Sequence, residues 1–183
     1  MSIRKNENGN LMAVFRKADS SDAQIMAETR QKAWNAVYRG IYPDEMIDNY
    51  DLEFHAARDR KRISDPDTAV WLVMDGSSCV GYLCVGPCGF GRYKDFDFCL
   101  NSLYHLPGYQ RAGLGRRAFE LTCAECLRRG YDKFFCACNF HNHLARAFYE
   151  HMGGIIGKES TGHDNMAEDM IFYEFSLGDA KGA

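Results

Sequence analysis

The stretch YQRAGLGRR, residues Tyr109–Arg117, places two glycines among arginines between an apolar segment and a helical pattern. Gly113 and Gly115 have no Cβ, so a bound group can closely approach their backbone N–H groups. These donors are expected at the start of a helix, where the positive end of the helix dipole favours phosphate. The side chains that add positive charge around this point are Arg111, Arg116 and Arg117. The stretch therefore predicts a binding site for an anion.

Two common phosphate-binding loops do not fit this stretch. A Walker A loop requires GxxxxGK[ST], and the chain has no Gly-Lys-Ser or Gly-Lys-Thr. A Rossmann loop needs a third glycine early in a βαβ unit, whereas the third position here falls near Phe119, past the middle of the chain. A third form does fit. The pattern Q-x-x-G-x-G runs from Gln110 to Gly115 and follows a strand that ends in proline, which is typical of another type of pyrophosphate-binding loop. A plain turn at a helix start is the alternative, but it would leave the arginines unexplained.

Length and composition indicate one globular unit. The chain has 183 residues, of which 46% are hydrophobic and 13% aromatic, so we expect a single domain over 1–183 with its ordered core at about 11–177. The net charge of −3 argues against a general nucleic-acid-binding surface. No run of about 18 apolar residues could cross a membrane, and the first ten residues lack the apolar core of a signal peptide. We therefore expect a soluble, cytoplasmic protein with no nucleic-acid or membrane partner.

Apolar periodicity and turn residues predict an α/β domain with a mixed sheet. In the first predicted helix Ser21 and Gln24 have capping-box spacing. Pro43 suits the first turn of the second helix, and Asn142 is expected to cap the last one. The predicted strands span residues 11–18, 69–75, 79–86, 96–106, 133–139 and 170–177. The predicted helices span residues 19–40, 42–63, 115–129 and 141–154.

The eight cysteines allow two interpretations. Most lie inside apolar runs, where a free cysteine behaves as a small buried hydrophobic residue. The alternative is a zinc site made of Cys123, Cys126, Cys136 and Cys138. The flanking sequence is that of a helix and a strand and not that of the tight turns in zinc knuckles, so we expect core cysteines and no metal.

Three stretches together resemble one family. SLYHLPGYQRAGLGRRAFEL, Ser102–Leu121, is similar to the central acyl-CoA motif of the GNAT family of N-acetyltransferases, [QR]-x-x-G-x-[GA]. NHLARAFYEHMGG, Asn142–Gly154, resembles the family pattern N-x-x-A-x-x-[LF]-Y-E-x-x-G-F. KAWNAVYRGIYPDEMI, Lys32–Ile47, resembles the segment of the first two helices in small bacterial members. The three stretches follow the family order and cover most of the chain.

The resemblance implies a fold and a co-substrate. The fold would be a single GNAT-like domain with a mixed, mostly antiparallel sheet of six to seven strands flanked by about four helices. The co-substrate would be acetyl-CoA, its pantetheine arm on the end of the fourth strand and its pyrophosphate on the glycine loop, with Asn142 reaching the arm. The cofactor-binding residues carried over are Leu103, Tyr104, His105, Gln110, Arg111, Ala112, Gly113, Leu114, Gly115, Arg116 and Asn142.

The resemblance also assigns a general acid but leaves the base open. Tyr149 matches the tyrosine that protonates the departing thiolate of coenzyme A, and its usual pKa of about 10 suits that role. A core aromatic residue is the alternative for Tyr149. Family members with a glutamate base have it where this chain has Cys99 or Ala137. Asp97, expected on the same strand face as Cys99, is the remaining candidate base, acting through water; otherwise the amine arrives already deprotonated.

The segment between the first two predicted helices would form the acceptor pocket by the same resemblance. Its aromatic residues, with carboxylates nearby, suit a cationic amine, although both are also ordinary features of helices. The acceptor-pocket residues are Trp34, Tyr38 and Tyr42.

Taken together, these features predict the transfer of an acetyl group from acetyl-CoA to a primary amine of a small molecule or peptide. The amine would attack directly in a ternary complex, with Tyr149 as the general acid. A module that binds acyl-CoA without turnover is the alternative, because neither glutamate is present. A different phosphate-bearing ligand, such as a nucleotide, is a third possibility. The resemblance also implies a homodimer.

Overall fold

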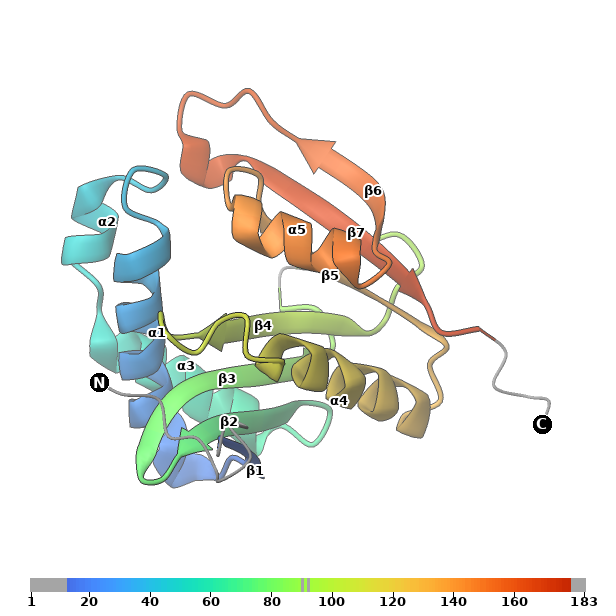
Figure 1. The fold of residues 1–183 in the computed structure, drawn as a ribbon, viewed down its shortest axis with the longest axis horizontal. Coiled ribbons are helices and arrows are strands. Elements are labelled where there is room, and N and C mark those ends of the chain that lie inside the picture. The colour runs from blue at the N-terminus through green and yellow to red at the C-terminus, as the bar shows by residue number, and fades with distance from the viewer. Residues whose placement is uncertain (1–12, 90, 92, 179–183) are drawn as a thin grey trace.

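The computed structural model describes residues 13–89, 91 and 93–178. The chain forms one seven-stranded sheet in the order β1-β2-β3-β4-β5-β7-β6 (Figure 1). All neighbouring strands are antiparallel except β4 and β5, which are parallel. The strands are β1 Val14–Lys17, β2 Ala69–Asp75, β3 Ser78–Gly86, β4 Cys99–His105, β5 Lys133–Asn139, β6 Ile155–Ser160 and β7 Met170–Ser176. The expected mixed, mostly antiparallel sheet is confirmed.

Five α-helices cover the two faces of this sheet. They are α1 Ala23–Val37, α2 Asp44–Asp48, α3 Leu52–Ser64, α4 Leu114–Arg128 and α5 His143–His151, with short 3₁₀ helices η1 Ser20–Asp22 and η2 Met166–Glu168. Figure 1 shows α4 and α5 in front of the strands and α3 behind them. The predicted ends of α4, β5 and β7 are confirmed to within one residue, whereas α5 ends at His151, three residues before its predicted end.

Alternation along β3 explains why both faces are buried. Leu83 and Val85 pack in the cluster that contains Ala118 of α4, whereas Tyr82 and Cys84 pack with Met26 of α1. Successive side chains of a strand point to opposite faces, so a strand covered on both sides reads as one continuous apolar run. β3 is buried from its second residue to its last.

The helical region before β2 differs from the prediction. One helix was expected over 42–63, but the structure has α2 and α3, separated at Tyr50, which is buried. Asp51 starts the second of these helices, since its carboxylate accepts a hydrogen bond from the N–H of Phe54 (2.9 Å). A new N-cap inside a continuous helical pattern therefore divides it.

Two further predictions are corrected. The capping box is formed by Asp19 and Asp22 on η1, not by Ser21 and Gln24. Strand β6 was missed because it is the edge strand of the sheet and most of its residues are exposed, which removes the alternation that identifies a strand. The predicted first strand began at 11, and residues 11 and 12 lie outside the described residues.

Candidate active site

The site begins where β4 and β5 stop pairing. Only Cys99 with Phe135 and Leu100 with Cys136 are in register, although β4 continues to His105. A cavity of about 680 Å³ opens beyond this point, lined by residues 100–105 of β4 and by Ala137 and Cys138 of β5. The backbone of β4 along the cavity has no partner from β5, so its polar groups are available to a ligand.

A β-bulge at Asn101 shapes the β4 wall of this cavity. The register of β3 with β4 shifts between Cys84 and Val85, whose partners are Ser102 and Leu100, so Asn101 is the extra residue. Its side-chain oxygen accepts a hydrogen bond from the N–H of Gly89 (2.9 Å), and its amide donates to the carbonyl of Pro87 (2.9 Å). The bulge is thus held in place by the loop that follows β3.

The glycine loop forms part of the cavity wall, and its two glycines have different roles. Gly113 has a φ of 80° and nothing within 4 Å of the position of a Cβ, so the left-handed backbone is the reason for glycine there. Gly115 faces the ring of Phe148, which would lie 3.0 Å from a Cβ. Gly115 therefore lets α4 pack closely against α5. Arg111 is also left-handed, with a φ of 61°.

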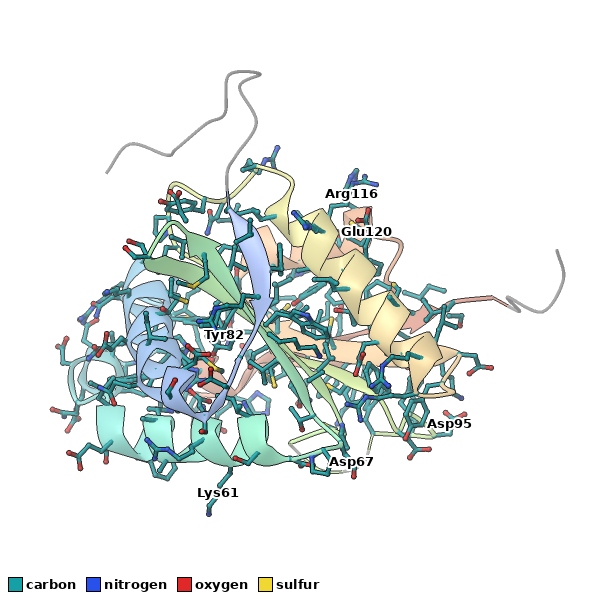
Figure 2. All side chains as sticks on the ribbon, turned by 90° about the horizontal axis from the view of Figure 1, so that it is seen from below. Lys61, Asp67, Tyr82, Asp95, Arg116 and Glu120 are labelled. Carbon is teal, nitrogen blue, oxygen red and sulfur yellow. The ribbon has the colours of Figure 1, made fainter. Side chains whose placement is uncertain are left out.

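The start of α4 is open to an anion. The N–H of Arg117 donates to the carbonyl of Gly113 (3.1 Å), and α4 has no side-chain cap hydrogen bond at its start. Arg111 and Arg116 are exposed and form no ion pair within the described part of the chain. Figure 2 shows Arg116 at the start of α4, pointing away from the sheet. Uncapped N–H groups and two available guanidinium groups are what a pyrophosphate requires.

Tyr109 anchors this loop to the sheet. Its hydroxyl donates to Oδ2 of Asp75 at the end of β2 (2.8 Å). Its ring packs against a small core cluster that contains Leu114, the first residue of α4. The loop is therefore tied to β2 on one side and continues into α4 on the other.

Tyr149 belongs to the cavity wall that α5 contributes. Its side chain lines the cavity but is only 7% exposed, and its ring is 5.7 Å from that of Tyr173. Burial, together with nearby Cys136 and Cys138, raises the pKa of Tyr149 well above its usual value. The phenol is therefore protonated at neutral pH.

Asn142 both caps the start of α5 and lines the cavity. Its side chain accepts a hydrogen bond from the N–H of Ala145 (3.1 Å), which confirms the predicted N-cap of α5. It also lines the cavity and hydrogen-bonds the side chain of Tyr38, the residue that follows α1. Burial is the main cause that raises the pKa of Tyr38. The turn before α5 is thus in contact with the end of α1.

An aromatic cluster closes the side of the cavity next to α1. Tyr38 stacks on Tyr42 with ring centroids 4.3 Å apart, and Trp34 meets both rings edge-on. The indole N–H of Trp34 donates to the hydroxyl of Tyr104 on β4 (3.2 Å). Burial raises the pKa of Tyr42 to about 12. The three predicted acceptor residues therefore form one contiguous group, although only Tyr38 lines the large cavity.

A second, smaller cavity of about 310 Å³ adjoins this aromatic cluster. One wall is Gly40–Asp44, between α1 and α2, and the other is Asp164–Met166, between β6 and β7. Tyr42 belongs to its wall and is stacked on Tyr38 of the large cavity. Figure 1 shows the loop between β6 and β7 reaching towards the α1–α2 segment.

Most of the predicted cofactor residues are brought together. The predicted residues that line the large cavity are Leu103, Tyr104, His105, Gln110, Arg111, Gly113, Gly115, Arg116, Asn142 and Tyr149. Ala112 and Leu114 do not line it, and Leu114 is buried under the loop. Burial lowers the pKa of His105 to about 4, so its ring is neutral.

Asp97 is not brought to the cavity. It is exposed, it precedes β4, and it is absent from the cavity lining. Cys99 is buried against Tyr93, Phe96 and Phe135. Among the described residues that line the large cavity there is no carboxylate.

Three positioning residues were not predicted from the sequence. The role of Asn101 depends on the β-bulge, which no residue pattern in the sequence predicts. The role of Phe148 depends on the packing of α5 against α4, which brings its ring to Gly115. Tyr109 was part of the quoted stretch, but its partner Asp75 lies 34 residues earlier in the chain.

The described residues contain neither a metal-binding cluster nor a membrane-spanning helix. No group of three or more His, Cys, Asp or Glu side chains there could hold a metal ion. Within the considered zinc set, the thiol of Cys126 donates to the backbone carbonyl of Lys133 (3.4 Å). In the described part of the chain, no helix is long and apolar enough to span a membrane.

Comparison with known proteins identifies the family. The model of the acetyltransferase (GNAT) family matches residues 28–154. No curated protein matches the chain. Similar solved structures include the PaiA N-acetyltransferase of Thermoplasma acidophilum in complex with coenzyme A, with 18% identity, TM-score 0.69 and coverage of 91% of this chain and 99% of that one. An acetyltransferase of Thermus thermophilus has 20% identity, TM-score 0.68 and coverage of 91% and 98%. YncA of Salmonella typhimurium, solved with its cofactor acetyl-CoA, has 19% identity, TM-score 0.67 and coverage of 93% and 96%.

These likenesses show a shared fold, and the family match covers more than half of the chain. The chain belongs to the GNAT family of acetyltransferases.

Proposed function

We propose that the protein is an N-acetyltransferase that moves the acetyl group of acetyl-CoA to a primary amine. The observation that carries this proposal is a single cavity lined by the uncapped start of α4, by the part of β4 that does not pair with β5, and by Tyr149. Two structures with the same fold contain coenzyme A or acetyl-CoA, which supports the choice of co-substrate.

The residues at the glycine loop fit a pyrophosphate. The N–H groups at the start of α4 bind one part of it, and Arg111 and Arg116 neutralise its charge. Gly113 leaves open space where a side chain would stand. The unpaired backbone of β4 at Leu103–His105 binds the amide groups of the arm, and Asn142 contacts the arm from the opposite wall.

Tyr149 supplies the proton for the leaving group. A thiolate that departs near the phenol needs a donor in a site from which water is excluded. Burial raises the pKa of Tyr149, so the phenol carries a proton at neutral pH. The acceptor amine approaches the thioester from the side of the stacked rings of Tyr38 and Tyr42, since Tyr38 lines the same cavity as Tyr149.

The absence of a carboxylate from the described lining of the large cavity favours a second candidate, a module that binds acyl-CoA without turnover. An amine panel separates the two. The protein is incubated with acetyl-CoA and benzylamine, 1,4-diaminobutane or an alanine tripeptide while free thiol is followed. Thiol release that requires one of the amines supports the transferase. Binding of coenzyme A, seen as a raised melting temperature, with no amine-dependent release supports the module. A melting temperature unmoved by coenzyme A contradicts both.

A further inference from the structure

Two cysteines meet where the loop after β3 returns to β4. Cys99 is the first residue of β4 and is only 1% exposed, whereas Cys88 lies two residues after the end of β3 and is half-buried. Cys88 packs against the buried cluster that contains Cys99, Tyr93 and Phe96. A hydrogen bond also joins the two thiols. The two sulfur atoms therefore lie side by side.

Strand register and a glycine turn bring this pair together. Gly86, the last residue of β3, is paired with Cys99, so Cys88 comes two residues after the residue that faces Cys99. Gly86 has a φ of 145°, and a Cβ there would lie 2.6 Å from the backbone carbonyl oxygen of Asp67. Only glycine fits such a position. The turn that leads to Cys88 is therefore fixed by the backbone.

The same loop holds the bulge of β4 in place. The side chain of Asn101 accepts a hydrogen bond from the N–H of Gly89 and donates one to the carbonyl of Pro87, both at 2.9 Å. Gly89 and Pro87 are the two chain neighbours of Cys88. Asn101 lines the large cavity and lies two residues after Cys99. A displacement of Cys88 towards Cys99 therefore acts on the β4 wall of the cavity through these two hydrogen bonds.

The two thiols differ in their access to an oxidant. The hydrogen bond with Cys88, together with burial, raises the pKa of the Cys99 thiol well above its usual value, so this thiol keeps its proton at neutral pH. Cys88 is the more exposed of the two. Arg62 reaches the next residue of the loop, since its Nη2 would lie 2.9 Å from a Cβ on Gly89. A partly exposed cysteine in an electropositive setting is the one that an oxidant attacks first.

A disulfide between these cysteines would move the loop and not the strand. The bond requires the two sulfur atoms to approach to about 2 Å, which is closer than two hydrogen-bonded thiols. Cys99 is held on both sides, because it pairs with β3 and with β5. Cys88 belongs to a loop and is drawn towards β4 instead. The hydrogen bonds between Asn101 and the chain neighbours of Cys88 are then lengthened or lost.

We propose that Cys88 and Cys99 form a reversible disulfide when a peroxide oxidises them, and that this bond weakens the binding of acyl-CoA by disturbing the bulge at Asn101. The disulfide itself does not depend on the proposed acetyltransferase function, whereas its effect on the cavity rests on that function. The pair is a redox-sensitive site on the wall of the cavity and takes no part in the transfer reaction.

The oxidation proceeds in two balanced steps. The sulfur of Cys88 attacks one oxygen of hydrogen peroxide, the oxygen–oxygen bond breaks, and the products are a sulfenic acid on Cys88 and one water. The sulfur of Cys99 then bonds to the sulfur of Cys88, and the sulfenic oxygen leaves as a second water with the proton of the Cys99 thiol. The two sulfur atoms together give up two electrons, which the peroxide accepts. A dithiol returns the two electrons and restores both thiols.

Disulfide mapping of the full chain tests the bond without any substrate. Trypsin cleaves after Arg92 and Lys94, between the two cysteines, so the bond leaves two tryptic peptides joined. After treatment with hydrogen peroxide and alkylation of the remaining thiols, we expect the joined peptides in the wild-type protein and their release by dithiothreitol. The variant Cys88→Ser should lack them. Cys123→Ser, at a half-buried cysteine of α4, is the matched control and should retain them.

Binding of acetyl-CoA, measured by calorimetry, tests the effect on the cavity, because this ligand has no free thiol to reduce the bond. We expect the oxidised wild-type protein to bind acetyl-CoA about 5-fold more weakly than the reduced protein, a change of the size of one lost hydrogen bond. Dithiothreitol, added and then removed before the titration, should restore the affinity. Cys88→Ser should bind acetyl-CoA equally well before and after treatment with peroxide.

The outcomes separate this inference from the proposed function. Wild-type protein without joined peptides, or joined peptides that persist in Cys88→Ser, would overturn the disulfide. A disulfide that leaves the affinity for acetyl-CoA unchanged would overturn the link to the bulge. A reduced wild-type protein that does not bind acetyl-CoA would overturn the proposed function and the effect on the cavity, whereas the peptides alone would still decide the disulfide.

Discussion

The cofactor half and the acceptor half of the site are built in different ways. At the cofactor half, most groups available to a ligand are backbone groups, at the start of α4, at the left-handed Gly113 and along the unpaired edge of β4. The side chains of Arg111 and Arg116 add charge to them from the same short stretch. At the acceptor half they are side chains from separate segments, such as the stacked Tyr38 and Tyr42 and the indole of Trp34, which donates to Tyr104 of β4. A backbone site is encoded in one short stretch, whereas a side-chain site depends on several segments meeting.

The largest effect is expected where the acceptor half depends on a buried ion pair. Arg30 of α1 is 1% exposed and donates to both carboxylate oxygens of Asp59 on α3, at 2.7 and 2.9 Å. Asp59→Ala leaves a buried guanidinium without its counter-charge, which costs about 3–5 kcal/mol of unfolding free energy. Urea denaturation measures this change. Asp67→Ala, at a 77% exposed carboxylate 3.9 Å from Arg129, is the control and should change it by less than about 0.5 kcal/mol.

The next effect concerns Tyr149, where the two halves meet. Tyr149→Phe removes the proton donor but keeps the ring that packs beside Tyr173, so kcat should fall by about 10²-fold. The dissociation constant of coenzyme A, measured by calorimetry, should stay within twofold because the phenol acts only on the departing thiolate. A kcat within threefold of the wild-type value would assign Tyr149 to the core and remove it from the mechanism.

A smaller effect is expected at the arginines of the cofactor half. Arg111→Ala/Arg116→Ala should weaken coenzyme A binding by about 10-fold, and the loss should shrink as salt is raised, since the lost interactions are charge-assisted and exposed. Lys61→Ala is the matched control, because Figure 2 shows Lys61 on α3, at the opposite side of the molecule from Arg116. Equal weakening by both substitutions would mean that only net charge matters and that the loop is not the pyrophosphate site.

The smallest effect is expected at the anchor of the glycine loop. Tyr109→Phe removes the hydrogen bond to Asp75 and leaves a buried carboxylate oxygen without that donor, at a cost of about 1 kcal/mol in unfolding free energy. Coenzyme A affinity should fall about threefold, because the loop keeps its backbone but loses part of its anchorage. An unchanged affinity would show that packing of the ring alone positions the loop.

Much of the cofactor half could be predicted because its signals are local. The glycines fix backbone angles, the arginines flank them, and the helix start follows directly, all within Tyr109–Arg117. The N-cap at Asn142 is equally local, since its partner Ala145 is three residues away. Even here the reason for Gly115 was different from the expected one, because the ring of Phe148 comes from another helix.

The acceptor half could be predicted only in part because its contacts are distant in the chain. Trp34 and Tyr104, for example, are 70 residues apart in the chain. Asp97 illustrates the difficulty: strand alternation suggested a face shared with Cys99, but β4 begins only at Cys99, and Asp97 stays exposed outside the cavity. Alternation says which residues share a face only after the ends of the strand are known.

The family, the mixed sheet and the glycine loop can all be read from the amino-acid order, because local backbone preference, short motifs and apolar periodicity specify them directly. The folded chain alone reveals the parting of β4 from β5, the bulge at Asn101 and the meeting of His141 and His163 on one carboxylate. Those features arise from strand register and from the packing of loops that are distant in sequence. Neither strand register nor loop packing produces a periodic or short-range pattern of residues.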